Sequence, residues 1–109
     1  MNHITLVQTF GLDQLAETEK PKHVKVLFDG PGRKLIEVKL RNGGVLSKHQ
    51  AAGPITVLCL AGNGIFRAGQ DLDETQALIA GSLITLEGGV DHEVVADPDV
   101  DLLVTKFDG

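Results

Sequence analysis

The sequence predicts a small all-β protein, built as a sandwich or a barrel. The chain has 109 residues, of which 42% are hydrophobic, which suits one core in a single domain over residues 1–109. Short segments of alternating apolar and polar residues recur along it, and glycine-containing turns separate them. Roughly seven to nine short strands and little helix are expected. An immunoglobulin-like sandwich is the alternative on strand number, although the Cys and Trp of that pattern are missing.

The first 21 residues are predicted to form an arm in front of the strands. Ile4, Leu6 and Phe10 stand among polar neighbours, which suits a strand or an extended segment. Residues 12–19 carry apolar side chains at helical spacing before Pro21, and this pattern predicts a short helix.

The rest of the chain is predicted to be strands and turns. Residues 24–28 and 36–40 alternate in the manner of half-buried strands, and a turn at 29–32 separates them. Residues 55–60 form a β-branched apolar run, and the Gly62-Asn63-Gly64 sequence after it predicts a hairpin turn. Three further strands are predicted at residues 83–86, 93–96 and 102–107, with turns at 88–89 and 97–99.

The charge of the chain disfavours nucleic acid as a partner. The net charge is −5, whereas phosphate binding requires clustered Lys and Arg. Residues 1–59 contain eight basic and five acidic residues, and residues 60–109 contain two basic and ten acidic ones. The favoured interpretation of this asymmetry is a solvated acidic surface, and the alternative is electrostatic pairing of subunits.

Hydropathy and cysteine content predict a cytoplasmic protein without a membrane partner. No apolar run approaches the length of a membrane span, and no charged-then-apolar signal segment opens the chain. The single cysteine, Cys59, excludes a disulfide framework within the chain and a cysteine zinc cluster.

The spacing of glycine and histidine over residues 43–96 resembles the two sequence motifs of the cupin family. In the first motif a glycine precedes a His-x-His pair, a glutamate and a second glycine at fixed spacing. In the second, a glycine precedes a Pro-x-Gly sequence, a histidine and an asparagine. The residues in register are Gly43, His49 and Gly62 for the first motif and Gly81, Gly89 and His92 for the second.

The resemblance implies a double-stranded β-helix, or jelly-roll barrel, with a cavity between its sheets. Family members usually hold a divalent metal there through three histidines and a glutamate. In this sequence Ala51 replaces the second histidine and Ile55 replaces the glutamate, so that only His49 and His92 remain. Firm metal binding usually needs three protein ligands. We therefore expect no certain cofactor, only a weakly bound divalent transition metal, with Cys59 considered as a soft third ligand.

Within that implied barrel, alternation along the strands predicts which side chains face the cavity. The first motif supplies one wall, the second motif another, and the strand at 36–40 closes a third. Most of these residues are apolar, so the two histidines would be the polar groups of the pocket. The predicted lining is His49, Ala51, Ile55, Val57, Cys59, His92, Val94, Ala96, Ile36, Val38 and Leu40.

The favoured function is that of a standalone cupin that binds a small molecule next to a degenerate metal site. An enzyme is the alternative, either a metal-dependent oxygenase or isomerase, or a metal-free histidine-based isomerase similar to the nucleotide-sugar epimerases of the family. Those epimerases rely on a tyrosine, which this chain lacks. A purely structural or partner-binding role is the third class. A homodimer is also expected, with residues 4–10 covering an edge strand.

Overall fold

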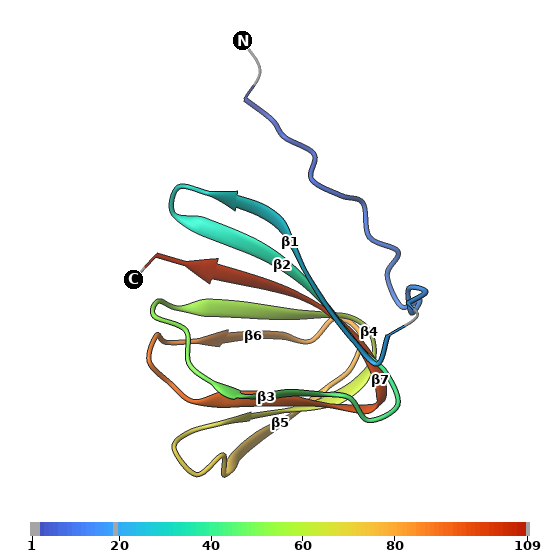
Figure 1. The fold of residues 1–109 in the computed structure, drawn as a ribbon, viewed down its shortest axis with the longest axis vertical. Coiled ribbons are helices and arrows are strands. Elements are labelled where there is room, and N and C mark those ends of the chain that lie inside the picture. The colour runs from blue at the N-terminus through green and yellow to red at the C-terminus, as the bar shows by residue number, and fades with distance from the viewer. Residues whose placement is uncertain (1–2, 19, 109) are drawn as a thin grey trace.

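The computed structural model describes residues 3–18 and 20–108, and it is all-β as predicted (Figure 1). No helix occurs in these residues, and therefore none that is long and apolar enough to cross a membrane. The strands are β1 (Lys22–Gly30), β2 (Arg33–Leu40), β3 (Val45–His49), β4 (Ile55–Ala68), β5 (Glu74–Leu78), β6 (Leu83–Leu86) and β7 (His92–Phe107).

Two long strands, β4 and β7, hold the fold together. They pair with each other along most of their length, and each also takes different neighbours with its two halves. The second half of β7 pairs with β2, and the first half of β4 pairs with β6, which gives the wall β1-β2-β7-β4-β6. The other halves pair with β3 and β5, which gives the wall β3-β7-β4-β5. The continuous sheet therefore curls into two facing walls with the core between them (Figure 1).

The predicted hairpin at Asn63-Gly64 is wrong, because β4 runs through this point without turning back. Its pairing with β7 shifts register between Cys59 and Ala61 and again between Gly62 and Gly64. Such bulges bend a strand and increase its twist, so the glycines allow β4 to pass from one wall to the other. Likewise, residues 97–99 bend inside β7 and do not separate two strands.

The predicted helix over residues 12–19 is also wrong for residues 12–18, while residue 19 lies outside the described residues. The segment lies against the strands, and residues of β4 and β7 accept hydrogen bonds from two of its backbone amides. Asp13 donates its backbone N–H to Leu60 O at 2.9 Å, and Ala16 donates its N–H to Asp101 Oδ2 at 2.7 Å. Tertiary hydrogen bonds thus replace local ones here.

The sequence prediction missed β3 and β5. Both have mostly polar side chains, and four of the five residues of β5 are exposed. Each strand forms ladder hydrogen bonds on one side only within the described chain, β3 with β7 and β5 with β4. Polar edge strands lack the alternation that marks a half-buried strand, so the hydropathy pattern does not reveal them.

Candidate functional site

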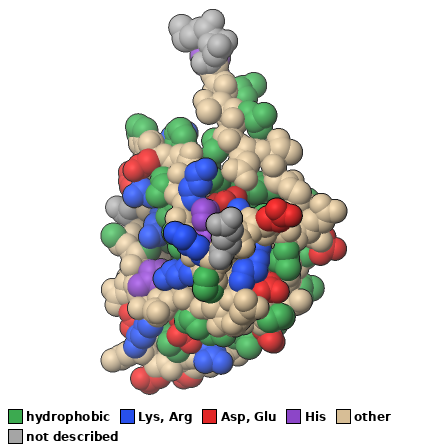
Figure 2. Space-filling view, turned by 45° about the vertical axis from the view of Figure 1, so that its right-hand side comes forward, with side chains coloured by type: hydrophobic (Ala, Val, Ile, Leu, Met, Phe, Trp, Pro, Cys, Tyr) green, Lys and Arg blue, Asp and Glu red, His purple; other side chains and the backbone are tan. Residues whose placement is uncertain are grey.

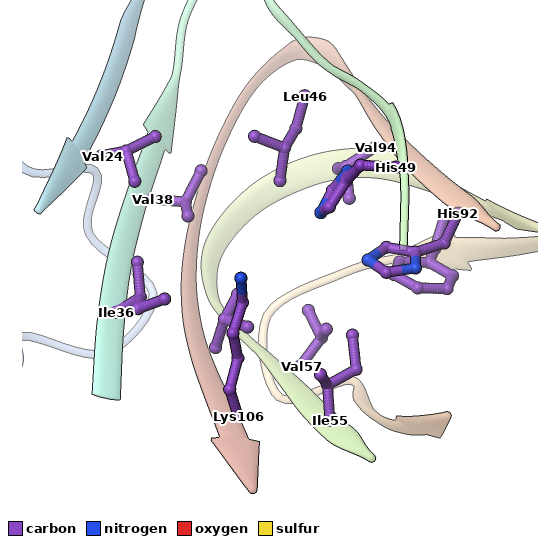
Figure 3. A pocket seen from close by; sticks show the side chains of 12 residues that line it. Val24, Ile36, Val38, Leu46, His49, Ile55, Val57, His92, Val94 and Lys106 are labelled. Carbon is purple, nitrogen blue, oxygen red and sulfur yellow. The ribbon is translucent and has the colours of Figure 1, made fainter. Parts of the chain in front are cut away.

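A cavity of about 80 Å³ lies between the two walls, and it is mostly apolar (Figure 3). Strands β1, β2, β3, β4 and β7 all contribute to its lining. His49, His92 and Lys106 are the polar residues among twelve. The full lining is Val24, Ile36, Val38, Leu46, His49, Ile55, Val57, Phe66, His92, Val94, Val104 and Lys106.

Seven of the residues predicted to face the cavity line it, namely Ile36, Val38, His49, Ile55, Val57, His92 and Val94. The remaining four are buried elsewhere. Three of them lie in the part of the core outside the cavity, and this part of the core continues past the register shift at Cys59. They are Leu40, Cys59 and Ala96. Ala51 lies in the loop after β3, where its carbonyl accepts the N–H of Gly89.

Sequence reasoning missed five lining residues, which are Val24, Leu46, Phe66, Val104 and Lys106. A signal for Lys106 was present in the alternation of β7. Four even-numbered positions of β7 line the cavity, as expected for side chains on one face of a strand. They are His92, Val94, Val104 and Lys106. Residue type alone would not indicate an inward position for Lys106, because lysine is rarely buried.

The two histidines lie side by side, because His49 of β3 is the cross-strand partner of His92 of β7. Their ring centroids are 4.2 Å apart and their planes make an angle of 59°. The ring of Phe66 stacks with His92 at a centroid distance of 5.7 Å and an angle of 12°. Both imidazoles stand on the same side of the cavity (Figure 3). This packing gives the rings fixed orientations.

Backbone carbonyl groups set the tautomer of both rings. His49 Nδ1 lies 2.7 Å from Ser47 O, and His92 Nδ1 lies 2.9 Å from Val90 O. A carbonyl oxygen only accepts hydrogen bonds, so Nδ1 carries the proton in each neutral ring. Each Nε2 atom then keeps its lone pair and acts as an acceptor or a metal ligand.

Burial lowers the pKa of His92 below the ordinary value for histidine. The hydrogen bond to Val90 opposes this effect, and so does the charge of Asp91. The charges of His49 and Lys106 act in the same direction as burial. Burial therefore favours the neutral form of His92, in which Nε2 is an acceptor.

The side chains at the site do not fit a firmly held metal ion. Among the described residues no group of three or more His, Cys, Asp or Glu side chains is placed to hold one. The Cys59 thiol is directed to the carbonyl of Ala61 at 3.6 Å and is not part of the lining, so it is not a third ligand. Nearby carboxylates are engaged elsewhere: Asp91 accepts from Gln50, and Glu93 pairs with Arg67. Two imidazoles alone make a weak site.

Known structures resemble the chain closely in fold although they differ in sequence. A cupin superfamily protein from Desulfitobacterium hafniense has a TM-score of 0.77 and 13% identity, over 87% of this chain and 84% of that one. An RmlC-like cupin protein from Desulfovibrio desulfuricans has a TM-score of 0.73 and 19% identity, over 98% and 96%. A cupin domain from Bordetella pertussis has a TM-score of 0.68 and 18% identity, over 86% and 100%.

No protein-family model matches the sequence, and no curated protein matches it either. The likeness therefore concerns the fold, and it agrees with the curled two-walled sheet. The jelly-roll prediction and the resemblance carried by the Gly and His spacing are confirmed: this chain has the fold of the cupin superfamily.

Proposed function

We propose that the chain is a small-molecule-binding cupin whose cavity recognises hydrogen-bond donors through the Nε2 atoms of His49 and His92. The observation that carries this proposal is the pair of imidazoles whose Nδ1 atoms are both occupied by backbone carbonyls. Each ring is thereby left with one acceptor in an otherwise apolar pocket. This combination of apolar walls with a few oriented polar groups is typical of ligand sites.

The energetics favour a ligand that carries hydroxyl or amide hydrogens. A ligand hydrogen that donates to Nε2 contributes about 0.5–1.5 kcal/mol net, because it replaces a hydrogen bond to water. Burial of a short hydrocarbon portion of the ligand against the aliphatic walls contributes about 25 cal/mol of binding free energy per Å² of buried apolar surface. At about 80 Å³ the cavity accommodates a compact molecule, and a longer one would extend past Val24 at the edge of the sheet.

NMR titration with a neutral probe tests the proposal. 2-Hydroxybutyramide combines a short aliphatic chain with hydroxyl and amide donors, and we expect it to shift the methyl signals of Leu46, Val57 and Val94. His92→Phe keeps an aromatic ring against Phe66 but removes the acceptor, so it should weaken binding about tenfold, in line with one lost hydrogen bond. His3→Phe, on the arm, is the matched control. Shifts that are absent, or that persist unchanged in His92→Phe, contradict the proposal.

A metal-free histidine-based isomerase is the second candidate. The observation that favours it is the lowered pKa of His92, because a neutral imidazole with a free Nε2 is poised to accept a proton. Exchange of the C2 hydrogen of the same probe in deuterium oxide is the measurement. Exchange that depends on His92 supports an enzyme, and the absence of exchange supports a binding protein.

We also propose that the protein forms a homodimer through its N-terminal arm. Ile4 and Leu6 are 91% and 78% exposed, and Figure 2 shows the arm extending beyond the body of the molecule with hydrophobic side chains on it. Strand β1 is at one end of the sheet order, and its Val24 and Val26 are half exposed. A second copy's arm would cover such an edge.

The double variant Ile4→Ser/Leu6→Ser tests this contact by sedimentation equilibrium. We expect twice the chain mass of 11.6 kDa for the parent protein and a shift to the single-chain mass for the variant. Leu83→Ser, which removes another exposed leucine far along the chain, is the control. A monomeric parent protein, or a dimer that survives the double substitution, contradicts this assembly.

A further inference from the structure

Lys106 is a charged residue in a place where the fold otherwise puts apolar ones. It follows Leu102 and Val104 on the inward face of β7, and it lines the cavity together with the two histidines. Figure 3 shows its side chain rising from β7 with the terminal nitrogen directed toward the interior of the cavity. Because β7 curves around the barrel, His92 at its start and Lys106 near its end line the same space.

No ion pair neutralises the Lys106 ammonium within residues 3–18 and 20–108. Its direct cross-strand neighbour on β2 is Lys34, a second cation with the same facing direction. Lys34 pairs with the exposed carboxylate of Asp29 at 3.7 Å, so it does not depend on the cavity for a partner. Like charges opposite each other on a sheet are destabilising, and an anion between them would reverse that effect.

We propose that the ligand of this site is a small 2-hydroxy or 2-amido carboxylic acid with a short aliphatic chain. This inference rests on the proposed function and names the ligand class. The carboxylate pairs with Lys106 Nζ, the neighbouring hydroxyl or N–H donates to an imidazole Nε2, and the aliphatic chain packs on Ile55 and Val57. Each of the three groups on the cavity wall then has a partner of matching chemistry.

The charge balance selects a carboxylate over a phosphate group. The lining contains a single ammonium, and a neutral imidazole presents an acceptor at Nε2, so a dianion would carry more negative charge than the lysine compensates in a mostly apolar space. A monoanion with a donor next to it satisfies the lysine and one of the two imidazoles. A simple carboxylate without that donor would place its oxygens against the Nε2 lone pairs.

The experiment compares 2-hydroxybutyrate with 2-hydroxybutyramide, which have the same shape and differ in charge. Dissociation constants are measured by NMR titration of the full chain and of Lys106→Met, which keeps the apolar stem and removes the charge. Lys48→Met is the matched control, because Lys48 pairs with Asp91 at 3.7 Å and does not line the cavity.

We expect the carboxylate to bind about tenfold more tightly than the amide, which is the range of a charge-assisted hydrogen bond. Lys106→Met should abolish that preference and leave amide binding unchanged, while Lys48→Met keeps it. Equal binding of both probes, or a preference that survives Lys106→Met, overturns the carboxylate assignment and leaves the binding function standing. If neither probe shifts the cavity signals, the proposed function itself is wrong.

Discussion

Gly62→Ala is expected to be far more destabilising than Gly81→Ala, although both glycines have a positive φ, 82° and 92°. A left-handed backbone costs a residue with a Cβ about 1–2 kcal/mol at either position. At Gly81 that is the whole cost, since a Cβ there would meet nothing within 4 Å. At Gly62 the Cβ would lie 2.1 Å from Asp99 O in β7 and 3.0 Å from Leu15 Cδ2 in the arm.

The close approach at Gly62 adds a steric cost to the conformational one. The oxygen belongs to the backbone of β7, so relief requires separating the two central strands at the bulge. Overpacking of this kind costs about 1–3 kcal/mol. The totals are then about 2–5 kcal/mol for Gly62→Ala and about 1–2 kcal/mol for Gly81→Ala.

Thermal unfolding followed by circular dichroism measures the difference. For a domain of this size 1 kcal/mol corresponds to roughly 4–8 °C in Tm. We expect a loss of about 4–16 °C for Gly81→Ala, and the steric cost at Gly62 should make the loss for Gly62→Ala larger by about 4–24 °C. Failure of Gly62→Ala alone to fold agrees with this expectation. Equal losses in the two variants would refute the close approach of β4 and β7 at Gly62.

Three further outcomes are expected. Because burial lowers the pKa of His92 in the folded state, the unfolded chain takes up this proton first. The stability that His92 contributes is present above the ordinary histidine pKa, and it decreases as the pH falls below that value. The variant His92→Phe should therefore have a flatter curve of Tm against pH between about pH 8 and pH 5. Burial also raises the pKa of the Cys59 thiol, so a thiol reagent should react with it only at the rate of unfolding; rapid labelling of native protein would contradict its core position. Finally, Arg41 Nη1 lies 2.7 Å from Asp101 Oδ1, a buried ion pair in which the two groups are not aligned as a hydrogen bond. Arg41→Met should lower the free energy of unfolding in urea by about 3–5 kcal/mol, because it leaves the buried carboxylate without its cation. Lys34→Met breaks an exposed pair and should lower it by less than about 1 kcal/mol.

Much of the fold was predictable because its signals are local. Alternation marked β1 and β2, and glycine-containing turns separated several strands from one another. The ordered spacing of His49 and His92 carried the resemblance to cupins, and these two residues are cross-strand partners at the cavity. Seven predicted lining residues followed from alternation along the strands of the barrel that the cupin resemblance implied, since a strand directs every second side chain to the same face.

Other features depended on contacts between distant parts of the chain. Gly62-Asn63-Gly64 has the local chemistry of a hairpin, yet pairing with β7 on both sides of it keeps β4 continuous. Residues 12–18 have helical spacing, but the backbone of Ala16 is held by Asp101, which comes from the far end of the sequence. In both cases tertiary hydrogen bonds outweigh a weak local preference.

By itself, then, the sequence determined the all-β class, the two histidines and most of the apolar wall, because these depend on the period of a strand and on glycine spacing. Only the tertiary structure decided that Lys106 joins His49 and His92, that Cys59 does not, and that both Nδ1 atoms bond to backbone carbonyls. The physical reason is the course of β7, a 16-residue strand that bends around the barrel. Because this strand is curved, residues from both of its ends line one cavity. No pattern within a short stretch of sequence predicts that they lie together.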